Sequence, residues 1–97
     1  MLFAKVIGTV VSEKSDEGIK NNKLLLVQQC NHRGSLKQKY FVAVDLVGAG
    51  KGEVVIISQG SSSRQTELTF QKPIDAVIIG IVDIISENNK EVYCKYK

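Results

Sequence analysis

Cysteine and histidine are the side chains in this sequence best suited to bind a metal or to act as nucleophile and base. Cys30 and His32 lie close together, and Cys94 lies near the end. A structural zinc site takes four such ligands, usually in short-spaced pairs, whereas this sequence holds two cysteines and one histidine. Cys30 and His32 also do not face each other as nucleophile and base unless their loop folds back. We therefore expect no catalytic residue, no metal site and no cofactor.

Carboxylates beside apolar segments could in principle form an acid–base pair. These are Asp45, Glu53, Asp75 and Asp83. A simpler interpretation is that Asp75 bonds to nearby backbone groups. Asp83 could instead pair with Arg64 or a lysine across an interface, since the planar guanidinium of an arginine can bridge two chains.

A glycine-rich run, Gly48-Ala49-Gly50-Lys51-Gly52, invites comparison with phosphate-binding loops. The dinucleotide pattern needs glycine at position 53, where Glu53 stands, and the P-loop pattern needs a longer spacing and Ser or Thr after the lysine. Both patterns also precede a helix, whereas a strand is expected here. The run therefore predicts a tight turn with positive φ angles. Its glycines would also let another backbone approach closely, which suits a subunit contact.

The length and composition fit one small globular domain over residues 1–97. The chain has 97 residues, a mass of 10.7 kDa, 43% hydrophobic residues and a net charge of +3. So small a domain is only marginally stable without a staple or a partner subunit. Two cysteines exclude a disulfide scaffold, and the charge is too small to indicate a nucleic-acid or membrane protein. The start lacks the order of a signal peptide, and the longest apolar stretch, 76–85, is too short to cross a bilayer, so we expect a cytoplasmic protein with reduced thiols.

Strands are expected along most of the chain, because valine and isoleucine dominate the apolar residues. Turn signals separate five predicted strands: Leu2–Val11, Lys23–Gln29, Lys39–Val47, Glu53–Ser58 and Ala76–Ile85. Gly80, inside the last of these, predicts a bend or bulge, as at a barrel corner.

Two further elements complete the expected fold. The capping-box pattern Ser62-Ser63-Arg64-Gln65 predicts one short helix. Asn88-Asn89 predicts a turn from which Glu91–Tyr96 returns as a hairpin strand. The sequence thus predicts a mainly β fold, a small five-stranded β-barrel with one short helix and a C-terminal hairpin.

Apolar side chains occupy both faces of the last two long strands. One face fills the barrel, and the other needs a cover because so large an exposed apolar patch is a liability in a monomer. The short helix and the hairpin could supply it, but both are too short to cover two strands. We therefore expect neighbouring chains to bury one of two alternating sets. These are Ile78, Val82 and Ile84, or Val77, Ile79 and Ile81.

Three stretches carry a resemblance to a known family. Residues 42–55 read V-A-V-D-L-V-G-A-G-K-G-E-V-V, residues 60–64 read G-S-S-S-R, and residues 73–83 read P-I-D-A-V-I-I-G-I-V-D. In this order they resemble the V-A-V-D-x-V-G-A-G-x-G-E-x-V, G-S-S-A-R and P-[VI]-D-A-x-I-[VI]-G-I-[VI]-D motifs of the microcompartment vertex proteins, the EutN/CcmL family. The chain departs from the pattern at Ser63, at Gln29-Cys30-Asn31 and at Ala4.

The resemblance implies an OB-like barrel that assembles as a cyclic homo-pentamer. Such pentamers cap the vertices of bacterial microcompartments in the cytoplasm, beside hexameric shell proteins. The motifs imply that two sets of residues lie near a subunit contact or the central axis. The sets are Gly48, Ala49, Gly50 and Gly52, and Gly60, Ser61, Ser62 and Arg64.

The alternative function is an OB-like barrel that binds single-stranded nucleic acid. Such barrels pair stacking aromatic side chains with a basic groove. Here the basic residues are scattered, with small groups at 33–39 and 95–97. Tyr40 and Phe41 adjoin the first group, and Tyr93 and Tyr96 lie near the end of the chain. Ordinary solubilising charge is the simpler interpretation, so we expect no nucleic-acid partner.

Overall fold

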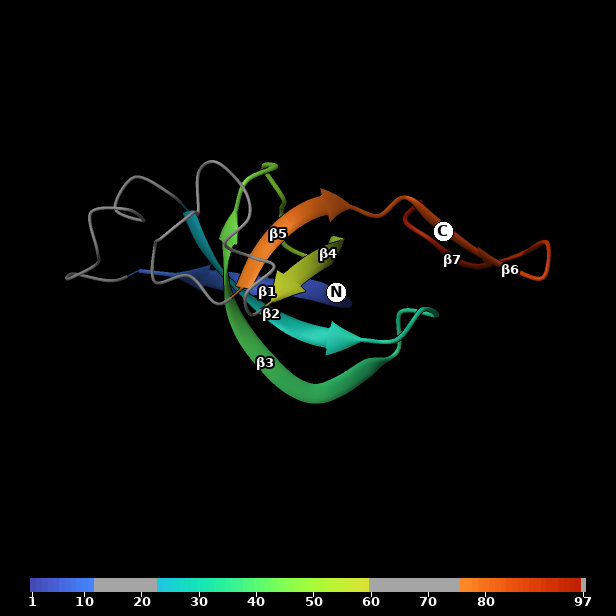
Figure 1. Ribbon diagram of the computed structural model, residues 1–97, viewed down its shortest axis with the longest axis horizontal. Helices are drawn as coiled ribbons and strands as arrows, with labels where there is room; N and C mark the ends of the chain where they lie inside the picture. The colour runs from blue at the N-terminus through green and yellow to red at the C-terminus, as the bar shows by residue number, and fades with distance from the viewer. Residues whose placement is uncertain (12–22, 60–75, 97) are drawn as a thin grey trace.

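Strands dominate the computed structural model, which describes residues 1–11, 23–59 and 76–96 (Figure 1). The strands are β1 (Leu2–Val10), β2 (Lys23–Cys30), β3 (Leu36–Asp45), β4 (Val54–Gln59), β5 (Ala76–Ile81), β6 (Ile84–Glu87) and β7 (Lys90–Cys94). No helix occurs in these three ranges, and the helix predicted from Ser62 lies outside the described residues. Within the same ranges, therefore, no helical segment has the length and apolar character to span a bilayer.

Five of the strands close into a barrel, in the order β1-β2-β3-β5-β4, with β4 pairing back to β1. Every pair is antiparallel except β3 and β5, which run parallel where Val44 faces Val77 and Asp45 faces Ile78. This is the arrangement of an OB-like barrel. The predicted mainly β barrel is confirmed.

The interior of the barrel is filled by the inward-facing residues of all five strands. Its fully buried side chains include Val6, Leu25, Val27, Val55 and Ile57. Buried and less buried residues alternate along β1 and β2, as the two-residue period of a strand requires. Burial of this aliphatic set is the main stabilising term of so small a domain.

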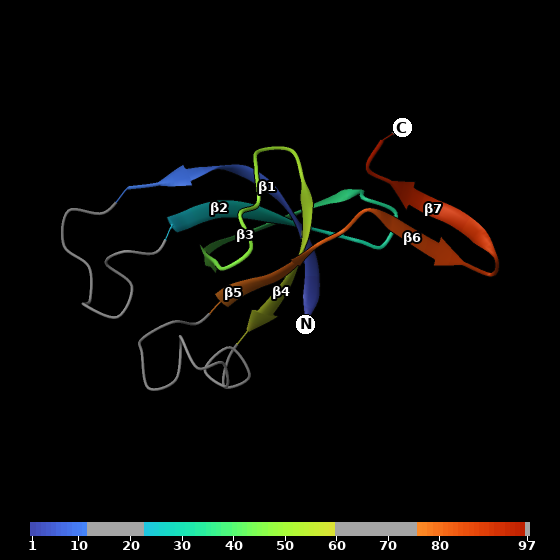
Figure 2. The ribbon, with the colours of Figure 1, turned by 90° about the horizontal axis from the view of Figure 1, so that it is seen from above.

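The predicted strand 76–85 is in fact two strands. A bulge at Ile79 lets Ile56 face Gly80 while Ile57 faces Ile78, which confirms the irregularity predicted at Gly80. β5 ends at Ile81, and one last 2.8 Å hydrogen bond, from the Val82 amide to the Val54 carbonyl, still ties the chain to β4 before it leaves the barrel. β6 pairs with β7 instead, and this hairpin projects from one end of the molecule (Figures 1 and 2).

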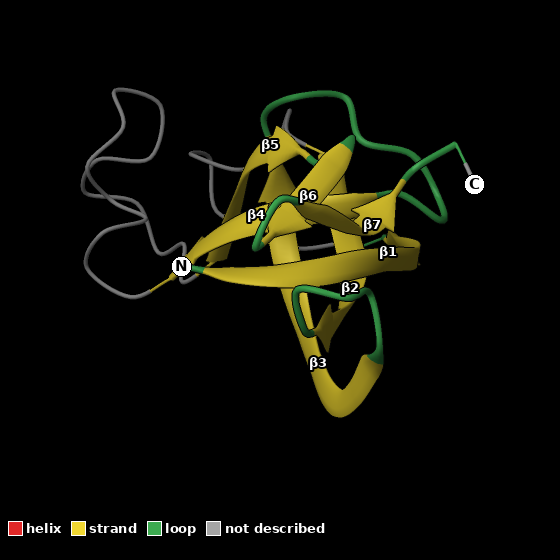
Figure 3. Ribbon diagram, turned by 90° about the vertical axis from the view of Figure 1, so that its right-hand side faces the viewer, coloured by secondary structure: helices red, strands yellow, loops and turns green. Residues whose placement is uncertain are grey.

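The hairpin covers part of the outer apolar surface of its own chain. Val82, Ile85 and Tyr93 pack with Cys30 and Val54 in a second apolar cluster outside the barrel. Figure 3, viewed from the hairpin side, shows β6 and β7 in front of the barrel strands. One alternative from the sequence was that the hairpin covers the outer apolar face of the last two long strands. The hairpin does cover this face, but only in part.

Two contacts hold the hairpin against the turn between β2 and β3. The ring of Tyr93 lies on Gly34, which has a φ of +83°, and the Glu87 carboxylate is 2.9 Å from Nε2 of His32. Arg33 adds a longer contact to Glu87, at 3.9 Å. The hairpin is therefore docked by an aromatic contact and a charged one.

Gly34→Ala is expected to loosen this docking. A Cβ on Gly34 would lie 3.0 Å from Cδ1 of Tyr93, and the positive φ strains any side chain. We expect the free energy of unfolding to fall by about 1–2 kcal/mol, measured by urea denaturation. Gly8→Ala is the matched control, because its Cβ would meet no atom within 4 Å. Equal losses in the two variants would contradict the role given to Gly34.

Candidate subunit interface

The glycine-rich loop after β3 is organised by the carboxylate of Asp45. Its Oδ1 accepts hydrogen bonds from the amides of Val47 and Gly48, each at 3.0 Å, and its Oδ2 accepts one from Ala49 at 2.9 Å. These amides have no strand partner, so the carboxylate supplies the acceptor they need. Because Asp45 already occupies them, the loop offers no amide cradle to a phosphate.

The predicted positive φ angles fall on two glycines of the loop. Gly48 has a φ of +77° and Gly52 of +90°, values that residues with a Cβ rarely adopt. Between them Ala49 turns inward and joins the barrel core, where it is buried. Ala49 therefore packs into the core of its own barrel. The placement of Gly48, Gly50 and Gly52 beside a subunit contact stays a prediction.

A second carboxylate, Glu53, holds the far end of the loop. It accepts a hydrogen bond from the Gly50 amide and forms a 2.5 Å ion pair with Nζ of Lys95, just after β7. The hydrogen bond from Lys95, and next that from Gly50, lower the pKa of Glu53 below its ordinary 4.5. The same pair raises the pKa of Lys95. Glu53 thus ties the loop to the end of the hairpin.

Stability should depend on pH through Glu53. The pKa of Glu53 is lower in the folded chain than in the unfolded chain. Its contribution to the free energy of unfolding is therefore complete above about pH 4.5 and is lost as the pH falls through the pKa of the folded chain. We expect the melting temperature of the unaltered protein to drop over this acidic range, and that of Glu53→Gln to drop less. Thermal unfolding from pH 3 to pH 7 measures the difference, and parallel curves for the two proteins would contradict it.

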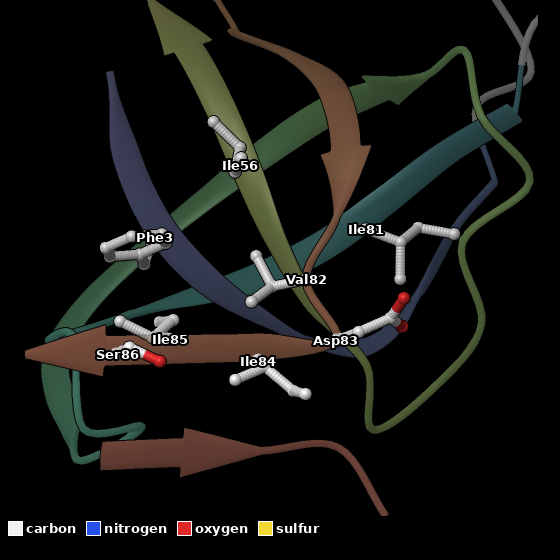
Figure 4. Close-up of a pocket in the computed structure, with 8 residues that line it drawn as sticks. All are labelled: Phe3, Ile56, Ile81, Val82, Asp83, Ile84, Ile85 and Ser86. Carbon is white, nitrogen blue, oxygen red and sulfur yellow. The ribbon is translucent and has the colours of Figure 1, made fainter. Parts of the chain in front are cut away.

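An apolar groove lies where the hairpin leaves the barrel (Figure 4). Its volume is about 610 Å³, and a smaller hollow continues it past Phe3 and Ile56 to Leu2 and Met1. We call this surface the groove. It is lined by Phe3, Ile56, Ile81, Val82, Asp83, Ile84, Ile85 and Ser86.

The groove is an open apolar surface with a charged rim. Asp83 is its one charged lining residue; its side chain is mostly exposed, and Nζ of Lys95 lies 4.0 Å from its carboxylate. Open apolar surfaces of this kind mark sites where a protein, a membrane or a ligand binds. Ile56 belongs to one of the two apolar faces predicted for its strand, whereas nothing in the sequence indicated a surface at Phe3.

The residues predicted to be buried between chains differ in their surroundings. Ile78 is 0% exposed inside the barrel and Val82 is 7% exposed under the hairpin, so their own chain covers both. This corrects the expectation that a neighbouring chain is needed to bury them. Ile84 is 52% exposed in the groove and stays a predicted interface residue. Gly60, Ser61, Ser62 and Arg64 lie outside the described residues, and their roles stay predictions.

The two cysteines and the histidine lie in different surroundings in the structure. Cys30 is buried, and this burial raises the pKa of its thiol despite the opposing effect of Lys5 and Lys37. Cys94 is a free thiol, and His32 contacts Glu87. In the part of the chain that the structure describes, no three ligands of this kind gather into a metal site.

The fold and the groove define a small OB-like barrel with a projecting C-terminal hairpin and an open apolar groove. The family model described as "Ethanolamine utilisation protein EutN/carboxysome" matches residues 1–83. The chain belongs to this EutN/CcmL family.

Relatives of the chain are shell proteins. It is 46% identical over 96 residues to the carboxysome shell vertex protein CcmL of a Nostoc species, covering 98% of this chain and 95% of the relative. The structure of CcmL from Gloeobacter violaceus matches with a TM-score of 0.93 and 40% identity, over 100% of both chains. GrpN, a pentameric microcompartment shell protein from Rhodospirillum rubrum, matches with a TM-score of 0.82 and 44% identity, over 90% of this chain and 99% of that one.

Proposed function

We propose that this protein is a structural shell protein whose chains form cyclic homo-pentamers that cap the vertices of a bacterial microcompartment. The observation that carries the proposal is the match of nearly the whole chain to shell vertex proteins, including one solved as a pentamer. The exposed groove adds a physical reason, because it presents apolar surface that a single chain leaves uncovered. Residues 1–97 would form one vertex domain located in the cytoplasmic microcompartment.

Fivefold symmetry explains why such a protein is needed. Hexameric tiles alone make a flat sheet, and a closed polyhedron requires points of fivefold symmetry. A cyclic pentamer uses one heterologous contact repeated around the axis, so each chain presents two different surfaces to its neighbours. The mechanism is shape, and the partners would be four further copies of this chain and the hexameric shell tiles around the vertex.

The proposal makes the protein non-catalytic. Asp45 is committed to backbone amides and Glu53 to an amide and Lys95, so neither is free for proton transfer. Their arrangement supports a role in holding the loop.

Co-expression with a hexameric shell protein tests the function. We expect closed polyhedral particles by electron microscopy when both proteins are present, and open sheets or tubes when the hexameric tile is expressed alone. Identical open assemblies with and without this protein would contradict the vertex role.

A further inference from the structure

The first half of β3 is exposed on both faces. All residues from Leu36 to Tyr40 are exposed, although a strand in a barrel wall ordinarily buries every second residue. A bulge is the cause, because residues 37–39 of β3 all lie opposite Gln29 of β2. A bulge bends its strand, and Figure 3 shows β3 curving away from the other barrel strands. This half of β3 therefore contributes little to the barrel core.

The edge of β3 that faces away from β2 is open over residues 36–43. β5 pairs with β3 only at Val44 and Asp45, and the hairpin contacts the turn before β3, at His32 and Gly34. Among the described residues, no strand other than β2 and β5 pairs with β3. We call this stretch the open edge. Such an edge presents backbone amides and carbonyls to which an extended peptide can add as a further strand.

Two kinds of side chain alternate along the open edge. Lys37 and Lys39 point to one face of the strand, whereas Tyr40 and Val42 point to the other. Tyr40 is 56% and Val42 50% exposed, and both lysines are exposed as well. Neither lysine forms an ion pair with a carboxylate of the residues that the structure describes. The open edge thus presents cations on one face and apolar side chains on the other.

We propose that the open edge binds an extended acidic segment of another protein as an added strand. Side chains directly opposite each other on paired strands lie close together on the same face. The segment would therefore place carboxylates opposite Lys37 and Lys39 and apolar side chains opposite Tyr40 and Val42. This inference goes beyond the proposed function, because a single chain carries the whole open edge.

The two lysines select the partner. Like charges directly opposite each other destabilise a strand pair, so Lys37 and Lys39 oppose pairing with the same edge of a second copy. The same two charges favour a strand that carries carboxylates. The open edge is therefore suited to a different protein rather than to another copy of this chain.

A synthetic peptide with the matching pattern, T-E-T-E-V-T-V-T, tests the proposal. Its reversed order, T-V-T-V-E-T-E-T, is tested beside it, because an added strand can run in either direction. We expect one of the two to bind at low salt, by fluorescence anisotropy, at least about tenfold more tightly than its counterpart with lysine in place of glutamate. No binding of either peptide would overturn the proposal.

Backbone methylation separates an added strand from simple charge attraction. N-methyl groups on alternate amides of the peptide should abolish binding when they face β3 and should leave it intact when they face away, because only one set of amides pairs with the edge. Binding that survives methylation of either set would overturn the added strand.

Charge reversal tests the role of the two lysines. Lys37→Glu with Lys39→Glu should exchange the preference, so that the lysine peptide binds and the glutamate peptide does not. Lys23→Glu with Lys90→Glu is the matched control, because it makes the same change in net charge at exposed positions off the open edge and should bind like the unaltered protein. Circular dichroism checks that both double variants remain folded.

The outcomes separate this inference from the proposed function. Equal loss of binding in the two double variants would overturn the inference and leave the lysines as ordinary protection of a strand edge. Sedimentation of the same samples reports the mass of the protein. A single-chain mass with the expected peptide binding would contradict the proposed ring and support the open edge as a binding surface.

Discussion

Ile84→Asp should yield a folded protein that no longer forms a ring. Ile84 is 52% exposed and lines the groove beside Asp83, so the substitution places a second carboxylate in the surface that we assign to the subunit contact. An uncompensated buried charge costs about 3–5 kcal/mol. At about 1.4 kcal/mol per tenfold, each contact should weaken at least a hundredfold. Sedimentation velocity should then report the mass of a single chain, 10.7 kDa.

Two comparisons separate this effect from a loss of folding. Val11→Asp adds the same charge at a position that is more exposed and outside the groove, and it should assemble like the unaltered protein. Ile78→Ala removes a side chain that is fully buried in the barrel, so it should lower the free energy of unfolding by about 2–5 kcal/mol. Assembly of Ile84→Asp at micromolar concentration would show that the groove is not the contact.

Asp45→Ala should cost the chain a large part of its stability. The substitution removes the acceptor of three amide hydrogen bonds, from Val47, Gly48 and Ala49. Hydrogen bonds to a charged group contribute about 1.5–3 kcal/mol each, but loop relaxation and water recover part of that. We expect the free energy of unfolding to fall by about 2–4 kcal/mol in urea denaturation, with Ala49 less firmly held in the barrel.

Asp45→Asn is the comparison for this prediction. Asparagine keeps one acceptor oxygen but loses the charge and the second oxygen. The free energy of unfolding of Asp45→Asn should therefore lie between that of the parent and that of Asp45→Ala. Measuring all three in the Ile84→Asp background removes the contribution of assembly to stability. Equal stability of Asp45→Ala and its parent would contradict the account of the loop.

Local signals in the sequence predicted the barrel well. Alternating valine and isoleucine placed the strands, and Gly48 and Gly52 predicted positive φ angles because glycine adopts them without strain. The irregularity near Gly80 followed from the same kind of local reasoning. These features depend on neighbours in the chain, which a single sequence displays.

Features that depend on distant contacts could not be predicted. The bulge at Ile79 shifts the alternation of β5 by one residue, so periodicity alone could not decide that Ile78 enters the core. The contact between His32 and Glu87 joins residues 55 positions apart, and nothing local links them. The groove likewise exists only because β6 leaves the barrel at Val82.

The mass of the unaltered protein in solution tests the central claim most directly. The claim is that apolar surface left open by one chain is covered by further copies around a fivefold axis. Native mass spectrometry should therefore find a single species with about five times the 10.7 kDa mass of one chain, which dissociates only on dilution or denaturation. A species with the mass of one chain at micromolar concentration would contradict the account.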